Sequence, residues 1–319
     1  MARSRSGNDD SAFSHWRRSR AAGTTGAAAL LVLLGACGDA ESALARGDRL
    51  WADSNYTEAL AEYRLSYERR SGSDDVLARV AHAYAVTGEF ERARESYDEL
   101  LGRTPEYRDQ AIFDYLSLAR RAQERGDRYG MAGAVEAALA LRPGLPVGEM
   151  SAPLARYYSR AGDAERAQVF YERALAYALP DSIPTLLFEF AEFHESQRNC
   201  AEALELFNAF RTREPAGERA DQARWSVGSC AFTLARAARE AGEPERALAY
   251  LQTTVDLGVP PNLLDQAWFE RGEALLEIGN RELALEAYIK VLETVRPGSG
   301  QLADRARQRI DELRFGRGF

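Results

Sequence analysis

Hydrophobic and polar positions follow a helical period through most of the chain. From about residue 40 onward, apolar side chains recur three and four residues apart, and no convincing stretch alternates with the period of two that a half-buried strand requires. Glycine and proline interrupt this pattern at intervals, so heptads cannot continue as they do in a long coiled coil. The pattern therefore predicts short helices arranged as a repeating unit.

A small residue marks the same position in each repeating unit. This position opens the buried stripe of the second helix, and successive copies are 34, 38, 36, 36, 44 and 37 residues apart. One degenerate copy carries Met131, and the others carry Ala59, Ala93, Ala167, Ala203, Ala247 and Ala284. Alanine lets helix backbones approach closely, so a larger residue there would overpack the contact, at a cost of about 1–3 kcal/mol.

Glycine and proline mark the turns of the same unit. A glycine after the first helix can adopt the left-handed conformation that ends a helix, and a proline stops the second helix. The turn residues between the two helices are Ser54, Gly88, Gly126, Gly162, Arg198, Gly242 and Gly279. The repeats close at Pro105, Pro143, Pro180, Pro215 and Pro297. We expect the length above 34 residues to lie in inter-repeat loops or in lengthened helices.

The segment VLARVAHAYAVTGEFERARESYDELLGRTP, which starts at Val76, resembles the tetratricopeptide repeat (TPR). The resemblance implies an all-α fold, a right-handed superhelical solenoid of about seven helix pairs over residues 40–297. Residues 298–319 are expected to form a C-terminal capping helix and tail. Leu302, Ala306, Ile310 and Leu313 form its apolar stripe, and the opposite face is charged, as the end of a solenoid requires.

The N-terminus has the layout of an export signal. Five arginines precede a run of about ten apolar or small residues that ends at Cys37, and this run is too short to span a bilayer. The ending Leu34-Gly35-Ala36-Cys37 resembles the bacterial lipobox. It implies a lipoprotein signal peptide over 1–36, cleavage between Ala36 and Cys37, and a diacylglycerol on Cys37, with 37–39 as a short tether to the membrane.

Charge and composition exclude several classes of function. The chain of 319 residues carries a formal net charge of −8, which argues against nucleic acid as a partner. The basic residues are almost all arginine, with Lys290 as the only lysine. The three histidines, His15, His82 and His194, are far apart in the sequence, and no metal-ligand spacing or phosphate loop occurs. We therefore expect no enzyme activity, no metal, no cofactor and no small-molecule substrate.

A TPR solenoid offers a groove that is lined by the first helix of each pair. Mapping groove positions through the repeats predicts partner contacts at Phe113, Arg120, Arg156, Arg160, Phe188, Glu192, Arg236, Arg239 and Phe269. Arg120, Arg156 and Arg160 would form a basic spot that attracts carboxylates, since arginine and aromatic residues are typical interface anchors. The alternative is that these are ordinary solvated arginines.

Two later segments resemble a narrower group of envelope proteins. ERADQARWSVGSCAFTLARAAREAGEPERAL, from Glu218, and NLLDQAWFERGEALLEIG, from Asn262, are similar to repeats of BamD-type lipoproteins of outer-membrane β-barrel assembly and of the Tol–Pal-associated coordinator. This chain has about seven repeats where the BamD family has five, so only the general role carries over. The resemblance implies a lipid-anchored periplasmic scaffold that binds envelope protein segments, and it favours the outer membrane over the inner one. An alternative is an accessory, ligand-binding regulator of a peptidoglycan enzyme.

Two further cysteines lie at similar heights on neighbouring helices. Cys200 stands 15 residues before Pro215 and Cys230 stands 15 residues after it, and both lie on apolar stripes. A protein exported from the cytosol can hold a disulfide between them, if the Cα atoms are closer than about 7 Å. The alternative is that the two are small buried thiols that pack as hydrophobes.

Overall fold

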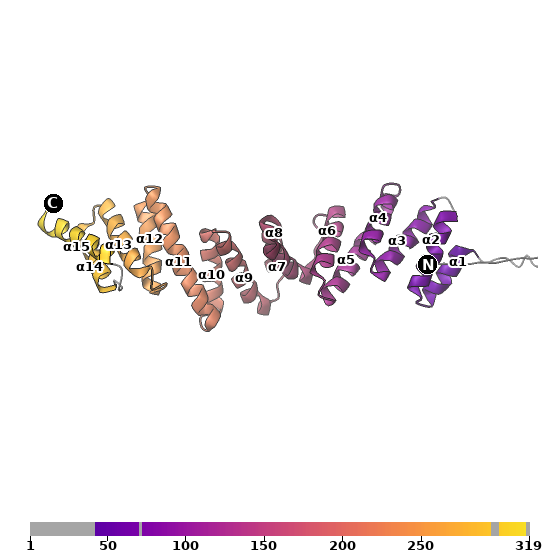
Figure 1. Cartoon of the computed structure of the whole chain (residues 1–319), viewed down its shortest axis with the longest axis horizontal. Coiled ribbons are helices and arrows are strands. Elements are labelled where there is room, and N and C mark those ends of the chain that lie inside the picture. The colour runs from indigo at the N-terminus through magenta and orange to yellow at the C-terminus, as the bar shows by residue number, and fades with distance from the viewer. Residues whose placement is uncertain (1–41, 70–71, 295–299, 317–319) are drawn as a thin grey trace, which may run out of the picture.

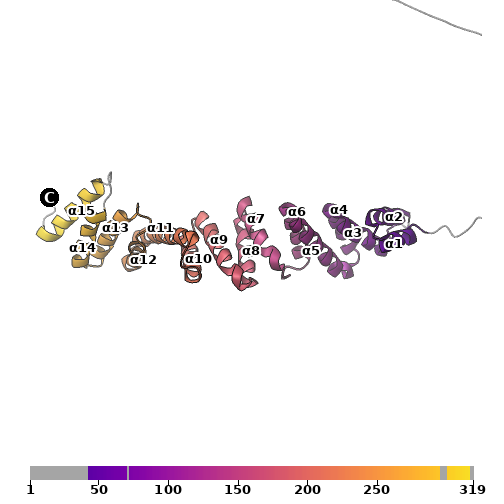
Figure 2. The same ribbon diagram turned by 90° about the horizontal axis from the view of Figure 1, so that it is seen from below.

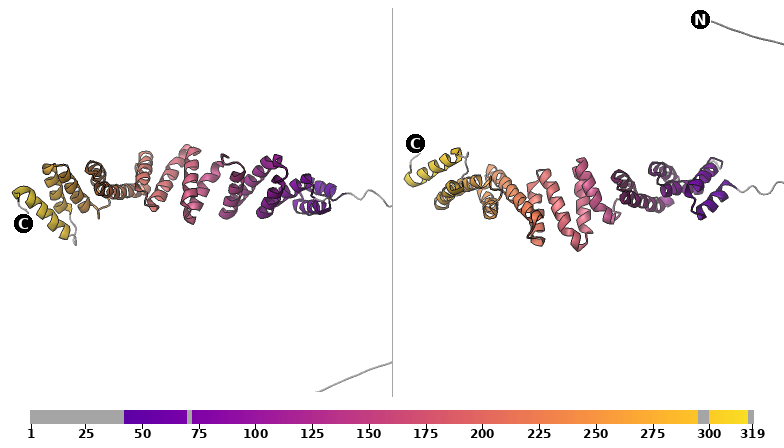
Figure 3. Two further views of the ribbon diagram at one scale, coloured as in Figure 1. Left: turned by 90° about the horizontal axis from the view of Figure 1, so that it is seen from above. Right: turned by 60° about the horizontal axis from the view of Figure 1, so that its bottom comes forward.

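The computed structural model describes residues 42–69, 72–294 and 300–316. These residues form fifteen α-helices and three short 3₁₀ turns, and they contain no strand. Consecutive helices pack as antiparallel pairs in one elongated row, with the first pair and the C-terminus at opposite ends (Figures 1, 2 and 3). The predicted all-α solenoid of seven helix pairs and a cap is confirmed. The predicted signal peptide and Cys37 lie outside the described residues.

Each pair consists of a first and a second helix. The first helices are α1 (Ala43–Ala52), α3 (Asp74–Thr87), α5 (Arg108–Glu124), α7 (Ser151–Ala161), α9 (Ile183–Ser196), α11 (Glu218–Glu240) and α13 (Leu264–Glu277). The second helices are α2 (Tyr56–Arg69), α4 (Phe90–Leu101), α6 (Arg128–Leu141), α8 (Ala164–Ala176), α10 (Cys200–Arg213), α12 (Pro244–Leu257) and α14 (Arg281–Thr294). The capping helix is α15 (Gly300–Phe315). We number the pairs repeats 1 to 7.

The turn within each pair has the predicted left-handed backbone. All seven turn residues have positive φ values, including the two that are not glycine, Ser54 (φ 62°) and Arg198 (φ 59°). The extra length lies where it was expected. The 44-residue step contains α11, which has 23 residues. A loop of nine residues, 142–150, separates α6 from α7 and includes a 3₁₀ turn at Gly148–Met150.

The contact residues are fully enclosed. The six alanines at the repeated position are each 0% exposed, and Met131 is 1% exposed. The stripe of the cap behaves in the same way, because Ala306 and Ile310 are buried in the cluster around Tyr288 and Leu302 and Leu313 pack against it. No described helix has both the length and the apolar character needed to cross a membrane.

The repeats are not joined equally. Repeats 1 and 2, 5 and 6, and 6 and 7 pack extensively, through α2 with α3, α10 with α11, and α12 with α13. Repeat 4, which is α7 and α8, meets its neighbours mainly through α6–α7 and α8–α9 contacts, which are much smaller. The contacts between repeats 2 and 3 are also small, so the row is packed more tightly toward its two ends than in its middle.

A glycine of α11 that packs against the end of α12 provides a test of how closely the helices of repeat 6 approach. A Cβ atom on Gly228 would lie 1.9 Å from the carbonyl oxygen of Val259, and the hydroxyl of Thr254 donates to the Gly228 carbonyl at 3.1 Å. We therefore predict that Gly228→Ala lowers the free energy of unfolding by at least about 1–3 kcal/mol, the usual cost of overpacking. Urea denaturation would measure it.

Gly144→Ala is the matched control, because nothing lies within 4 Å of its added Cβ atom and its φ is not positive. Its effect should stay within about 0.5 kcal/mol. Equal stabilities for the two variants would contradict the close approach at Gly228.

Candidate partner-binding cavities

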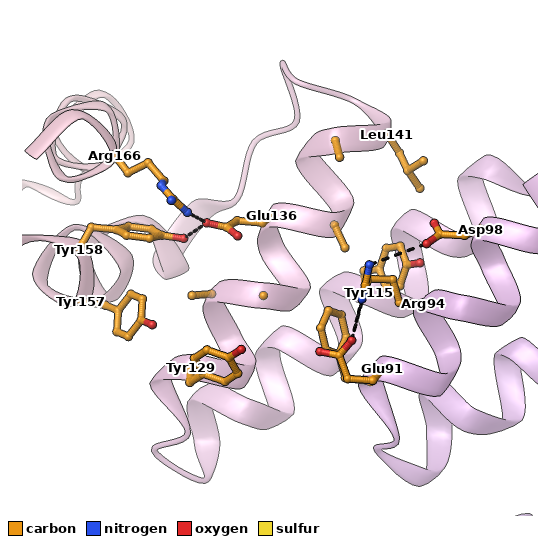
Figure 4. A pocket seen from close by; sticks show the side chains of 15 residues that line it. Glu91, Arg94, Asp98, Tyr115, Tyr129, Glu136, Leu141, Tyr157, Tyr158 and Arg166 are labelled. Carbon is orange, nitrogen blue, oxygen red and sulfur yellow. Dashed lines mark hydrogen bonds and ion pairs between the residues drawn. The ribbon is translucent and has the colours of Figure 1, made fainter. Parts of the chain in front are cut away.

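One cavity lies between repeats 2, 3 and 4, away from the predicted groove. It has a volume of about 520 Å³ and is lined mainly by α4, α6 and the α7–α8 pair. We call it the tyrosine cavity, because its walls include Tyr115, Tyr129, Tyr157 and Tyr158 (Figure 4). Tyr129 is 75% exposed, so one wall is open to solvent.

Small residues of α6 leave the space for this cavity. Ala132, Gly133, Ala137 and Ala140 line it, and a Cβ atom on Gly133 would already lie 3.2 Å from the ring of Phe90. Tyrosine presents a large apolar surface with a polar tip and is enriched at protein interfaces. This surface can accept an apolar or aromatic side chain of a partner.

The charged groups of the tyrosine cavity are already paired with one another. Arg94 forms ion pairs with Glu91 at 2.9 Å and with Asp98 at 3.8 Å. Glu136 accepts hydrogen bonds from Tyr158 and from Arg166, which come from α7 and α8 (Figure 4). Burial first, and then the bond to Glu136, raises the pKa of Tyr158, so its hydroxyl stays a donor. The cavity therefore offers aromatic surface rather than free charge.

A second cavity lies on the first helices, where the groove was predicted. It has a volume of about 430 Å³ and lies between α11, α13 and α15. We call it the arginine cavity, because Arg236 and Arg305 line it, together with Phe232, Phe269, Asp265 and Glu270. The guanidinium of Arg305 lies 4.3 Å from the ring centroid of Phe269. Within the described residues, no carboxylate lies within ion-pair distance of Arg305.

The remaining charges of the arginine cavity are partly satisfied. Arg236 has only an exposed i,i+4 partner, Glu240, at 3.6 Å. Asp265 is 4% exposed and accepts the backbone N–H of Gln266 at 2.9 Å. Glu270 is paired with Arg239, which comes from α11. Arg305 and Arg236 therefore leave positive charge beside an apolar wall.

Some of the predicted groove residues are exposed and unpaired within the described ranges, and others form ion pairs between helices. Phe113 is 66% exposed, and Arg120 and Arg160 are exposed without an ion pair among the described residues, as a contact residue should be. Arg156 is instead paired with Glu189 at 2.8 Å, and Arg239 is paired with Glu270 and Glu277. These two arginines join neighbouring first helices, so the expected basic spot lacks Arg156 as a free cation.

Two of the phenylalanines that were predicted as partner contacts are buried. Phe188 is 4% exposed because its ring packs against Phe207 and Phe210 of α10. Phe269 is 2% exposed because Tyr288 and Arg305 cover it, although its ring forms part of the arginine cavity wall. Another predicted groove residue, Glu192, accepts from the side chain of Gln222 at 3.0 Å, and burial raises its pKa.

Sequence reasoning missed the tyrosine cavity, Arg305 and the partner of His82. His82 Nδ1 lies 2.8 Å from the carboxylate of Asp114, which is 2% exposed and also accepts from Tyr97. The ring of His82 lies 5.0 Å from that of Trp51. No described group of histidine, cysteine, aspartate and glutamate side chains has an arrangement that could hold a metal ion.

A comparison with known protein families matches two parts of the chain. Residues 44–108 and 232–299 match the family model of the tetratricopeptide repeat, which is under half of the chain. They span repeats 1 and 2 and most of repeats 6 and 7. No curated protein matches the chain.

Solved structures of repeat proteins also match, at low identity. A structure of Naa15/Naa10 bound to HypK-THB is 14% identical over 85% of this chain, with a TM-score of 0.37, and this chain spans 38% of it. The TPR2AB-domain:pHSP90 complex of yeast Sti1 is 14% identical, with a TM-score of 0.35 and coverage of 85% and 96% of the two chains. A tetratricopeptide repeat protein from Parabacteroides merdae is 13% identical, with a TM-score of 0.30 and coverage of 85% and 97%. Likenesses this weak support no inference about function.

One hydrogen bond at the tyrosine cavity can be tested directly. Tyr158→Phe removes the donor to Glu136, and we predict a loss of about 1–2 kcal/mol in the free energy of unfolding. In a Glu136→Ala background, where residue 136 has no side-chain acceptor, the same change should cost less, because the two residues share one bond. Chemical denaturation of the four proteins of this cycle would measure the coupling.

Tyr157→Phe is the matched control. The Tyr157 hydroxyl has no hydrogen-bond partner among the described residues, so its removal should change stability by less than about 0.5 kcal/mol. A coupling of zero between Tyr158 and Glu136 would show that the bond does not join the two repeats.

Proposed function

Because the chain folds as an all-α tetratricopeptide-repeat solenoid, we propose that it is a lipid-anchored scaffold of the bacterial cell envelope that binds segments of partner proteins. TPR repeats generally mediate protein–protein interactions, and a solenoid of helix pairs offers extended surfaces for them. The observation that carries the proposal is the arginine cavity, where Arg305 lies on an aromatic ring without a carboxylate partner in the described part of the chain.

The arginine cavity favours a partner segment that carries a carboxylate next to an apolar side chain. Arginine presents five N–H donors and binds carboxylates in a bidentate manner, and Phe269 holds the Arg305 guanidinium in place before binding. Phe232 and Leu302 add apolar surface to the same cavity. A carboxylate of the partner would meet Arg236 and Arg305, while its neighbouring side chain would pack on the apolar wall.

The proposed location rests on the N-terminal sequence. The apolar run that ends in Leu34-Gly35-Ala36-Cys37 is similar to a lipobox, and lipidation of Cys37 would attach the solenoid to a membrane through acyl chains. We propose the periplasmic side of the envelope, with the outer membrane favoured over the inner one. A role in assembling outer-membrane proteins is the narrower form of this proposal.

The lipid anchor can be tested at one residue. Cys37→Ser removes the sulfur that forms the thioether, so we predict that the variant loses incorporation of a palmitate analogue in the producing cell. Labelling followed by mass analysis of the N-terminal peptide would measure this. Cys200→Ser is the control and should remain labelled, and continued labelling of Cys37→Ser would rule out the anchor.

The arginine cavity can be tested by partner capture. We predict that Arg236→Gln with Arg305→Gln reduces capture of the partner from detergent-solubilised membranes about tenfold or more and makes the remaining capture less sensitive to salt. Quantitative mass spectrometry of a pull-down with the full chain would measure both effects.

Arg307→Gln is the matched control, because Arg307 lies on the same helix but pairs with Asp304 at 2.6 Å and does not line the cavity. Undiminished capture by the double variant would contradict the assignment of this cavity. The captured proteins also separate the two readings of function, since cell-wall enzymes in place of assembly proteins would favour an accessory of a peptidoglycan enzyme.

A further inference from the structure

Two thiols meet at the contact between repeats 5 and 6. Cys200 is the first residue of α10, and Cys230 lies in the interior of α11, which packs along α10. Both are free cysteines, Cys230 is 1% exposed, and Cys200 is partly exposed. Cys230 is a buried member of one hydrophobic cluster, and Cys200 packs against that cluster.

The surroundings of the two thiols differ in a way that assigns them different chemistry. Cys200 stands at the amino end of α10, where the helix dipole favours a thiolate. The hydrogen bond from the Cys230 thiol lowers the pKa of Cys200, and a second contact from Thr233 acts in the same direction, against the effects of burial and of Glu195. The same Cys200 contact, together with burial, raises the pKa of Cys230.

We propose that Cys200 and Cys230 are a redox-active pair that closes a disulfide between repeats 5 and 6, with Cys200 as the attacking thiol and Cys230 as the resolving thiol. Access supports these roles, because an incoming oxidant can reach the partly exposed Cys200 but not the enclosed Cys230. The packing of α10 on α11 brings both cysteines to one hydrophobic cluster, so the resolving thiol lies on the helix that packs against the attacking one.

The oxidant is a disulfide, either that of a small thiol such as glutathione or that of a thiol–disulfide oxidoreductase. The Cys200 thiolate attacks one sulfur of this disulfide, its S–S bond breaks, and one thiol leaves after taking a proton. Cys230 then loses its proton and attacks the Cys200 sulfur of the mixed disulfide, and the second thiol leaves. Two electrons and two protons have then passed from the cysteine pair to the oxidant.

The bond would hold a helix that lines the arginine cavity. Phe232 and Arg236 lie two and six residues after Cys230 on α11, and both line that cavity. Oxidation would therefore fix this helix to repeat 5. The proposal about the cysteine pair does not depend on partner binding, and its test uses no partner.

The test treats the folded full chain with oxidised glutathione, alkylates the remaining thiols after unfolding, and digests the product with trypsin. We expect a disulfide between the peptides Asn199–Arg211 and Trp225–Arg236, and the loss of two alkylatable thiols per chain. The oxidised chain should also melt at a higher temperature than the reduced chain, because the bond restricts the unfolded state. A wild-type product in which Cys200 keeps glutathione and Cys230 stays alkylatable would overturn the proposal.

Two variants separate the roles of the thiols. Cys230→Ala should stop at a mixed disulfide on Cys200 and should show no rise in melting temperature from an internal bond. Cys200→Ser should leave Cys230 unreactive until the chain is unfolded. Rapid glutathionylation of Cys230 in the folded Cys200→Ser variant would show that the assigned roles are wrong.

Discussion

The close approach of helix backbones at one repeated position is the constraint on which the whole row depends. A helix pair buries only one face by itself, so every pair needs its neighbours to cover the other. The enclosed alanines at this position make that contact with almost no side chain between the helices, and Met131 is the single larger residue. The step from Ala93 to Met131 is 38 residues, against 34 for the step before it. Repeat 3, which contains Met131, shares only a small contact with repeat 4.

Buried tyrosines add polar contacts that fix how the helices align. Apolar faces alone permit helices to slide, whereas a buried hydroxyl must find an acceptor. Burial is the main cause that raises the pKa of each of these tyrosines, so all of them remain donors. The donor–acceptor pairs are Tyr63 with Asp48, Tyr97 with Asp114, Tyr158 with Glu136, and Tyr288 with Glu273. Two of them join different repeats, Tyr97 to α5 and Tyr158 to α6.

The fold could be predicted from the sequence because its determinants are local. The left-handed turns at Ser54 and Arg198 were found although neither residue is glycine, since spacing along the chain defines the turn. The repeated alanines were found for the same reason. The spacing predicted that repeat 6 is longer than the others, but not that α11 is the longer element. Sequence spacing alone does not distinguish a longer loop from a longer helix.

The sites were predicted less well because they depend on contacts between repeats. The helical period placed Phe188 on the open face, but its ring turns toward α10. Arg156 and Arg239 were expected to be free, and each has a carboxylate on the next first helix. The tyrosine cavity depends on how far repeat 4 stands from repeat 3, and no single segment encodes that distance.

The small contacts on both sides of repeat 4 determine how the row responds to force. In a row of units that touch only their neighbours, stiffness in bending is set junction by junction, and the smallest contact deforms first. Bending is therefore concentrated between α4 and α9, where the contacts between repeats are smaller than those toward the two ends. The walls of the tyrosine cavity belong to both sides of one such joint, so its width changes with the curvature of the row.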